Sequence, residues 1–226
     1  MNNDEKVIKR GFLLGLDASS KIIGFCVFNK EKEVINELNS YSIKAERDIL
    51  LKAQEFEIWL ESLLVKWPKI NEIVIEESFQ AMYGTTSDAH TIALLNQVNA
   101  LYRYICYQKG LKVNTLSVSA ARGFCFPTYS FQNKKKSGGK NHKQQAFELV
   151  LKEIGDIYFP IKIISRGKNK GEVRFEETCY DMSDSYILVR AYMNKLSGID
   201  PKAIKKEIHK IATKNKRKAA KDIMKY

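Results

Sequence analysis

The sequence has few of the residues that hold zinc or form disulfides. Only four of its 226 residues are cysteine and three are histidine, with no Cys-x-x-Cys pair and no histidine cluster nearby. This spacing argues against a zinc site. Each cysteine has apolar or aromatic neighbours, as reduced thiols in a protein core usually do. We therefore expect a cytoplasmic protein without disulfides.

Long apolar runs and negative charge are also scarce. No run approaches the roughly 20 apolar residues that span a bilayer, and the polar first five residues do not resemble a signal peptide. The 26 acidic residues face 38 basic ones, which gives a net charge of +12 and a pI of about 9.4. Such a charge predicts a polyanionic partner, with nucleic acid as the first candidate and an acidic membrane surface as the second.

What is present is enough apolar sequence for one large domain, since 44% of the residues are hydrophobic. Strands with two-residue periodicity are followed by helices with 3.6-residue periodicity. The predicted strands cover 11–17, 22–29, 33–43, 72–77 and 111–118, and the predicted helices cover 49–67, 85–110, 142–154 and 182–196. The order predicts an α/β fold: a five-stranded mixed sheet, with three antiparallel strands and then parallel ones, and helices on both faces.

Three stretches look like additions to this core. Residues 127–141 form a flexible basic loop, and 157–178 alternate around a Gly-rich basic turn, which predicts a hairpin. After residue 200 the chain is Lys-rich, with one apolar stripe at helical spacing. We therefore predict a domain over residues 1–200 with two insertions, and a basic helical extension over 201–226.

Four acidic residues stand at the ends of apolar segments. Asp17 and Glu76 each close a predicted strand, and Asp181 and Asp184 open a predicted helix, three residues apart on one face. Carboxylates that end buried strands are costly to desolvate unless something binds them. One interpretation is that Asp17 and Glu76 begin turns while the aspartates complement a helix dipole. The other is a site for two Mg²⁺ ions roughly 3.5–4 Å apart, which hydrolyses phosphodiesters.

The motifs around these acids resemble those of the RuvC family of Holliday-junction resolvases, within the RNase H-like and retroviral-integrase superfamily. The first is Leu14-Gly15-Leu16-Asp17, where Ala18-Ser19 replaces the family's usual Pro-Gly. The second is Val74-Ile75-Glu76-Glu77-Ser78-Phe79, and the third is Asp181-Met182-Ser183-Asp184-Ser185. The resemblance covers about residues 11–196.

The resemblance implies an RNase H-like fold and an Mg²⁺-dependent endonuclease in which Mn²⁺ can substitute. The metal ligands and catalytic residues it implies are Asp17, Glu76, Asp181 and Asp184. Phe79 takes the place of an aromatic residue near the junction crossover, and Arg122 and Lys143 are the nearest matches to residues that touch the cleaved phosphate. The insertions and the Lys/Asn/Ile-rich composition suggest a phage or viral member, in the cytoplasm of a bacterial or phage-infected host cell.

The predicted partner is branched DNA rather than a membrane. We expect a homodimer that resolves four-way junctions in DNA recombination and repair, because a two-fold symmetric junction calls for two active sites. An RNase H-like or flap and fork nuclease with the same metal site, or a non-catalytic basic DNA-binding module, remain alternatives.

Lysines in the first insertion have two interpretations. They are either a solvated charged face or a DNA contact near the cleft, and we predict the DNA contact. These residues are Lys134, Lys135, Lys136 and Lys140. For Phe79 the choice is between stacking on unpaired bases and packing in the core, and we predict DNA contact.

Overall fold

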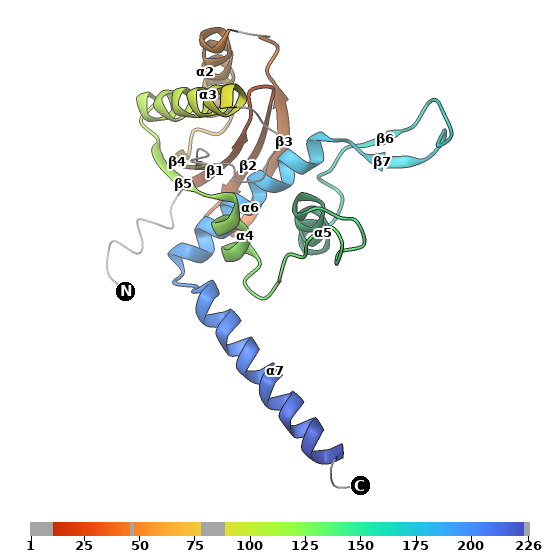
Figure 1. The fold of residues 1–226 in the computed structure, drawn as a ribbon. Helices are drawn as coiled ribbons and strands as arrows, with labels where there is room; N and C mark the ends of the chain where they lie inside the picture. Colours follow the sequence, from red (N-terminus) through yellow and green to blue (C-terminus); the bar gives the residue numbers. More distant parts are fainter. Residues whose placement is uncertain (1–10, 46–47, 78–88, 224–226) are drawn as a thin grey trace.

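A five-stranded sheet forms the centre of the computed structural model, which describes residues 11–45, 48–77 and 89–223 (Figure 1). Strands β1 to β3 are antiparallel, and β4 and β5 run parallel to β1, in the order β3-β2-β1-β4-β5. The strands are β1 (Phe12–Ala18), β2 (Ile22–Asn29), β3 (Val34–Ser42), β4 (Ile70–Glu76) and β5 (Lys112–Leu116). The predicted mixed sheet is confirmed.

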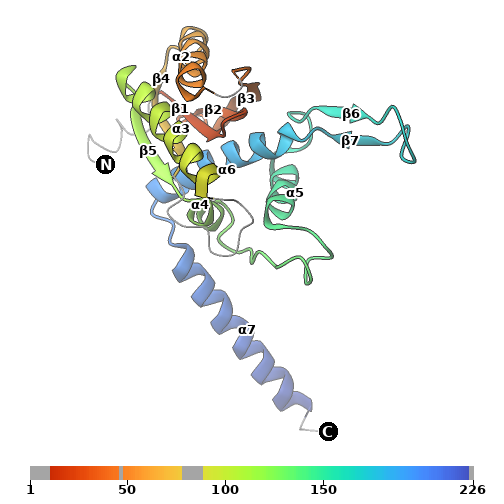
Figure 2. The ribbon, with the colours of Figure 1, turned by 45° about the horizontal axis from the view of Figure 1, so that its top comes forward.

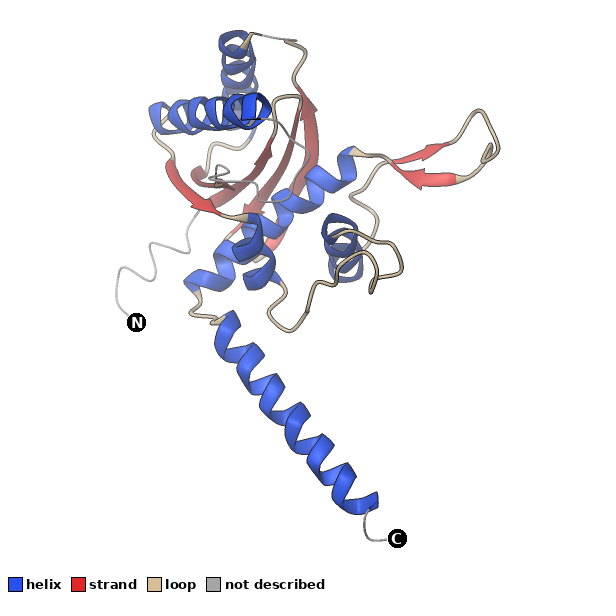
Figure 3. Ribbon diagram, in the orientation of Figure 1, coloured by secondary structure: helices blue, strands red, loops and turns tan. Residues whose placement is uncertain are grey.

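Helices cover both faces of the sheet, as predicted (Figure 3). Side chains alternate along a strand, so that Leu13 faces one layer and Leu14 the other. One layer consists of α2 (Ile49–Lys66) and α3 (Ala89–Gln108). The opposite layer consists of α4 (Val118–Cys125), α5 (His142–Ile154) and α6 (Thr178–Leu196).

Helix α6 lies directly on the sheet because two glycines leave room for its backbone. A Cβ atom on Gly24 of β2 would come within 2.0 Å of the Asp181 carbonyl oxygen. A Cβ on Gly15 of β1 would come within 2.4 Å of the Ser185 carbonyl oxygen. The first two turns of α6 are therefore held close to the carboxyl end of β1.

A buried polar network fastens the other end of α6. Glu72 of β4 accepts hydrogen bonds from Tyr192 Oη of α6 (2.6 Å), Lys30 Nζ (3.1 Å) and Asn114 Nδ2 (3.1 Å), and pairs with Lys112 Nζ at 2.9 Å. The side chains of Lys30 and Glu72 are only 2% and 5% exposed, so both charges are desolvated and depend on each other. The network joins the turn after β2 to β4, β5 and α6.

Two elements project from this body (Figure 2). The predicted hairpin is confirmed as β6 (Ile161–Ile163) and β7 (Val173–Phe175), which pair antiparallel in a sheet of their own. Beyond α6, the long helix α7 (Pro201–Ile223) leads away from the body in a different direction. No described helix is long and apolar enough to cross a bilayer.

Three local predictions need correction or refinement. Residues 117–118, predicted as the end of a strand, are the N-cap and first residue of α4, a helix that the sequence analysis missed. Helix α6 begins at Thr178 instead of 182, so Asp181 lies inside its first turn. The first insertion is tied at both ends to α5, because the Gln145 side chain donates to the carbonyl oxygens of Gln132 and Lys140.

Candidate active site

The four predicted acids come together at one edge of the sheet. Leu16 of β1 pairs with Ile75 of β4 in parallel register, so the residues that follow, Asp17 and Glu76, lie side by side at the carboxyl ends of both strands. Asp181 and Asp184 reach the same place from α6. All four line one cavity of about 290 Å³. The geometry that the strand-end pattern predicted is present, whereas the metal-binding role stays a prediction.

The turn after Asp17 is fixed without the Pro-Gly pair. Ser19 Oγ accepts hydrogen bonds from the amides of Lys21 (3.2 Å) and Ile22 (2.9 Å) and donates to the Ile22 carbonyl at 2.7 Å. From α2, the buried Lys52 donates to the Ser20 carbonyl at 2.8 Å. A serine turn and a lysine clamp thus hold Asp17 at the mouth of the cavity.

Two predicted phosphate-binding residues line the same cavity. Arg122 comes from α4, and its guanidinium is 3.5 Å from Asp184 Oδ1. Lys143 comes from the first turn of α5, and its Nζ is 2.7 Å from Asp181 Oδ1 and 3.5 Å from Asp184 Oδ2. The side chain of Lys143 is 40% exposed and that of Arg122 15%, so the lysine can reach a substrate outside the cavity more readily.

Burial makes three of the carboxylates hard to ionise, and repulsion between neighbouring acids adds to this for two of them. Burial, followed by the charges of Asp184 and Glu76, raises the pKa of Asp17 well above its usual value. Burial and the charge of Asp184 raise the pKa of Glu76 to about 7, although a hydrogen bond with Asp17 acts in the other direction. Burial also raises the pKa of Asp184, against the opposing charges of Lys143 and Arg122. Burial alone would lower the pKa of Lys143, but Asp17 and Asp184 raise it overall.

The donor chemistry of this cavity suits a hard divalent cation. Carboxylate oxygens are the preferred ligands of Mg²⁺. The raised pKa values come first from burial and, for Asp17 and Glu76, also from neighbouring negative charge, and a bound cation would favour the ionised form of these groups. Across the described ranges, however, no three His, Cys, Asp or Glu side chains are gathered closely enough to hold a metal ion. Lys143 and Arg122 pair with the two α6 aspartates instead, so Lys143 would have to release Asp181 when a cation binds.

The sequence analysis missed three polar residues that line the cavity: Ser19, Asn96 and Asn99. Asn99 is buried in α3, and its Nδ2 donates to the Glu76 carbonyl oxygen at 3.0 Å. This hydrogen bond fixes the end of β4 against α3. The available signal was the pair of asparagines three residues apart, on one face of the predicted helix.

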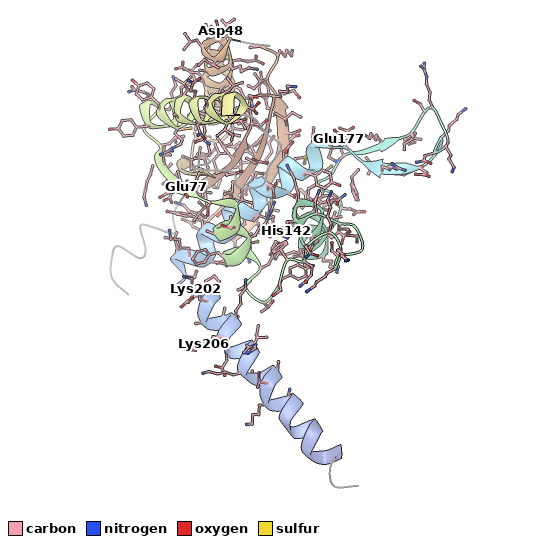
Figure 4. All side chains as sticks on the ribbon, in the orientation of Figure 1. Asp48, Glu77, His142, Glu177, Lys202 and Lys206 are labelled. Atoms are coloured by element: carbon pink, nitrogen blue, oxygen red, sulfur yellow. The ribbon has the colours of Figure 1, made fainter. Side chains whose placement is uncertain are left out.

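The remaining predicted DNA contacts lie elsewhere. The four lysines of the first insertion are exposed and are not among the described residues that line the cavity. One of them, Lys140, pairs with Glu148 of α5 at 2.5 Å. Phe79 lies outside the described residues, so its predicted contact with the junction is not tested. Figure 4 marks Glu77 at the end of β4, next to Glu76, where it is exposed at the rim of the cavity.

Comparison with known proteins finds similar structures. No family model and no curated protein matches the sequence. RuvC from Thermus thermophilus superposes with a TM-score of 0.50 at 12% identity, over 81% of this chain and 93% of that one. RuvC from the same organism in complex with a Holliday junction gives 0.50 at 10% identity, over 82% and 94%. The yeast mitochondrial Holliday junction resolvase Ydc2 gives 0.51 at 17% identity, over 83% and 80%. At these identities the likeness establishes the architecture, and the chain therefore has the RNase H-like α/β fold of RuvC.

Proposed function

We propose that this protein is a metal-dependent endonuclease that cuts branched DNA, with four-way junctions as its main substrate. The observation that carries the proposal is the cavity at the sheet edge, where four carboxylates meet one arginine and one lysine. The fold adds support, because solved structures that share it include Holliday junction resolvases, one of them bound to its junction.

Each residue of the cavity has a role in this proposal. Asp17, Glu76, Asp181 and Asp184 would hold two Mg²⁺ or Mn²⁺ ions. When bound, such ions supply the positive charge that activates water and stabilises the leaving oxygen of an in-line displacement. Lys143 and Arg122 would bind the non-bridging oxygens of the phosphate. A phosphate that takes up Lys143 would draw it away from Asp181, so substrate binding and the release of the aspartate are coupled.

We also propose that the protein works as a homodimer, in the cytoplasm of a bacterial or phage-infected cell. Two opposed cuts in a two-fold symmetric junction need two active sites. Helix α3 offers a surface for this, because Leu94, Leu95 and Leu101 remain partly exposed while Val98 and Ile105 are buried in the core.

The test is the substitution Asp181→Asn. Asp156→Asn is the matched control, because Asp156 is exposed and is not among the described residues that line the cavity. Cleavage of a four-way junction in Mg²⁺ should fall by roughly a hundredfold or more in Asp181→Asn, because several kcal/mol of transition-state stabilisation are lost. Junction binding should remain, and Asp156→Asn should cut like the wild type. A fully active Asp181→Asn would contradict the proposed metal role.

Substrate class is tested in the same assay. A four-way junction, a fork, an RNA–DNA hybrid and a linear duplex are compared at equal concentration. Preference for the hybrid or the fork would favour the RNase H-like or flap nuclease, and equal cutting of linear duplex would exclude a resolvase.

One observation favours a second candidate, a basic DNA-binding module without catalysis. Asp181 and Asp184 are already paired with Lys143 and Arg122, which is how structural acids behave. This candidate expects DNA binding but no cleavage of any substrate, with or without Mg²⁺, whereas the nuclease must cut when the ion is present.

A further inference from the structure

The β6–β7 hairpin, with the turn between its strands (residues 161–175), forms an arm that stands away from the body (Figures 1 and 2). Isolated two-stranded hairpins are marginally stable in water, and beyond its root at Phe175 this arm is largely exposed. Ile161, Ile163 and Val173 are 59%, 69% and 58% exposed. An element of this kind contributes little to the hydrophobic core. Its exposure instead indicates that it contacts another molecule.

The charge on the arm is mostly positive. It carries five basic residues and one acidic residue, and all six are exposed. Lys162 and Arg174 are directly opposite each other across the strands, on the face opposite to the apolar side chains. Like charges in this position destabilise a hairpin, and only Glu172, bonded to Arg174 at 2.6 Å, offsets them locally. A polyanion laid along this face would remove the repulsion.

The tip of the arm is an ordered turn that adds three more positive charges. The amide of Ile164 donates to the Glu172 carbonyl and that of Gly171 to the Ile164 carbonyl, so the ladder continues beyond the two strands. Gly167 and Gly171 have φ values of 83° and 91°, which allow the chain to reverse. Arg166, Lys168 and Lys170 are therefore presented on a shaped turn.

The root of the arm is locked to the elements that carry the active-site residues. Phe175 of β7 packs edge-on against Phe147 of α5 at 5.2 Å, and Phe147 packs against Phe159 at 5.1 Å. Helix α5 also carries Lys143, and α6, which carries Asp181, begins just after the arm. Figure 4 marks Glu177 at this junction. The arm is thus fixed at its root to the two helices that supply Lys143 and Asp181 to the cavity.

We propose that the basic face and tip of this arm bind a duplex segment of the DNA substrate beside the cleavage site. The proposal rests on the proposed function for the identity of the polyanion. A two-stranded ribbon fits the major groove of B-DNA, and its lysines and arginines fix position on the phosphates without reading sequence. From Ile161 to Gly167 the arm reaches about 20 Å, which corresponds to roughly 6 base pairs of duplex.

The first test removes the tip charges with the triple substitution Arg166→Ser, Lys168→Ser and Lys170→Ser. Its matched control removes three exposed lysines at the opposite edge of the sheet, Lys32→Ser, Lys66→Ser and Lys69→Ser. Affinity for a labelled four-way junction is measured in EDTA over a range of NaCl concentrations, so that no cleavage occurs. In the tip variant, the slope of log affinity against log salt should fall by about 2 to 3, and the Kd at 0.1 M should rise roughly tenfold or more.

The control variant should keep the wild-type slope. Hydroxyl-radical protection should disappear in the tip variant from one duplex segment of roughly 6 base pairs and stay in the control. Equal slopes and equal footprints in the tip variant and the wild type would overturn the proposal. A loss of self-association in the tip variant, seen as a smaller mass in sedimentation with the slope unchanged, would also overturn it, because the arm would then contact a second copy of the chain.

A second variant separates binding from structure. The substitutions Lys162→Thr and Arg174→Thr remove the like-charge pair and insert residues that favour strands, so the hairpin should become more stable while DNA binding weakens. A purely structural role cannot produce these opposite effects, and unchanged binding would count against the arm. Because binding is measured without cleavage, the proposed nuclease can fail in the Asp181→Asn test while the arm still binds DNA. A wild-type protein that binds no DNA would refute both.

Discussion

At the scale of single residues, the buried carboxylate of Glu72 links the stability of the fold to pH. Burial raises its pKa, but hydrogen bonds from Tyr192, Lys112 and Lys30 act more strongly together, and its pKa lies below the usual value. A carboxyl group whose pKa is lowered by folding stabilises the native state above its unfolded pKa of about 4.3 and loses that contribution as the pH falls below it. The stability of the protein should therefore decrease below about pH 4.

The substitution Glu72→Gln tests this network. It leaves the buried Lys30 without its counter-charge, and breaking a buried ion pair in this way costs about 3 kcal/mol or more. The free energy of unfolding, measured by urea titration at pH 7, should fall by that amount, and its difference from wild type should shrink at acid pH. Glu31→Gln, at an exposed turn position, is the matched control and should change the free energy of unfolding little. An equal loss at pH 7 and pH 3 would contradict the linkage.

Residues differ in how far the sequence alone identifies them. Asp17 and Glu76 could be found because a carboxylate at the end of an apolar run is anomalous wherever the fold places it. Glu72 could not, since it sits two residues into its strand, and its partner Tyr192 lies 120 residues away. Asn99 acts through a hydrogen bond to a backbone carbonyl, which no motif records.

At the scale of elements, the contact between α6 and the sheet sets the active site. Gly15 and Gly24 let the helix backbone touch the strands, and this contact brings Asp181 next to Asp17. The predicted helix over 142–154 is confirmed as α5, and in the structure Asn141 and Gln144 form a capping box at its start. It missed α4, which has eight residues and only Ser117 as a start signal. Short helices give too few turns for periodicity to be recognised.

The substitution Gly24→Ala tests the helix contact. A Cβ atom 2.0 Å from the Asp181 carbonyl oxygen cannot be accommodated without moving α6. Overpacking of this kind costs about 1–3 kcal/mol or more, and displacement of both α6 aspartates should reduce cleavage as well.

Gly123→Ala in α4 is the matched control, because nothing lies within 4 Å of the added Cβ. In the interior of a helix this change should stabilise by about 0.5–1 kcal/mol. Gly24→Ala should therefore lower the thermal midpoint and reduce junction cleavage, whereas Gly123→Ala should raise the midpoint and leave cleavage unchanged. A Gly24→Ala protein with wild-type stability and activity would show that α6 does not rest on this glycine.

At the scale of the whole molecule, α6 stands between the two projections. The arm connects directly to the first turn of α6. At the other end, α6 stops before Gly198, which has a φ of 77°, and α7 follows. Asp200 then caps α7 by accepting hydrogen bonds from the amides of Lys202 and Ala203. Figure 4 marks Lys202 and Lys206 on α7, beyond the body. Local signals predicted the hairpin and the basic helix, but their positions at opposite ends of α6 follow only from the fold.

Deletion of residues 201–226 should separate the role of α7 from that of the body. Through Asn215 nearly all of its described side chains are exposed, so its removal should shift the thermal midpoint by less than about 3 °C, which corresponds to roughly 1 kcal/mol for a chain of this size. The deleted stretch holds ten basic and two acidic residues, and the salt dependence of junction binding should therefore become shallower.

The triple substitution Lys205→Gln, Lys206→Gln and Lys210→Gln keeps the helix and should reproduce part of this loss, because the effect comes from charge. Differential scanning calorimetry and junction titrations measure the two quantities. A large drop in the midpoint would mean that α7 belongs to the folded body, and unchanged binding would mean that its charge serves another purpose.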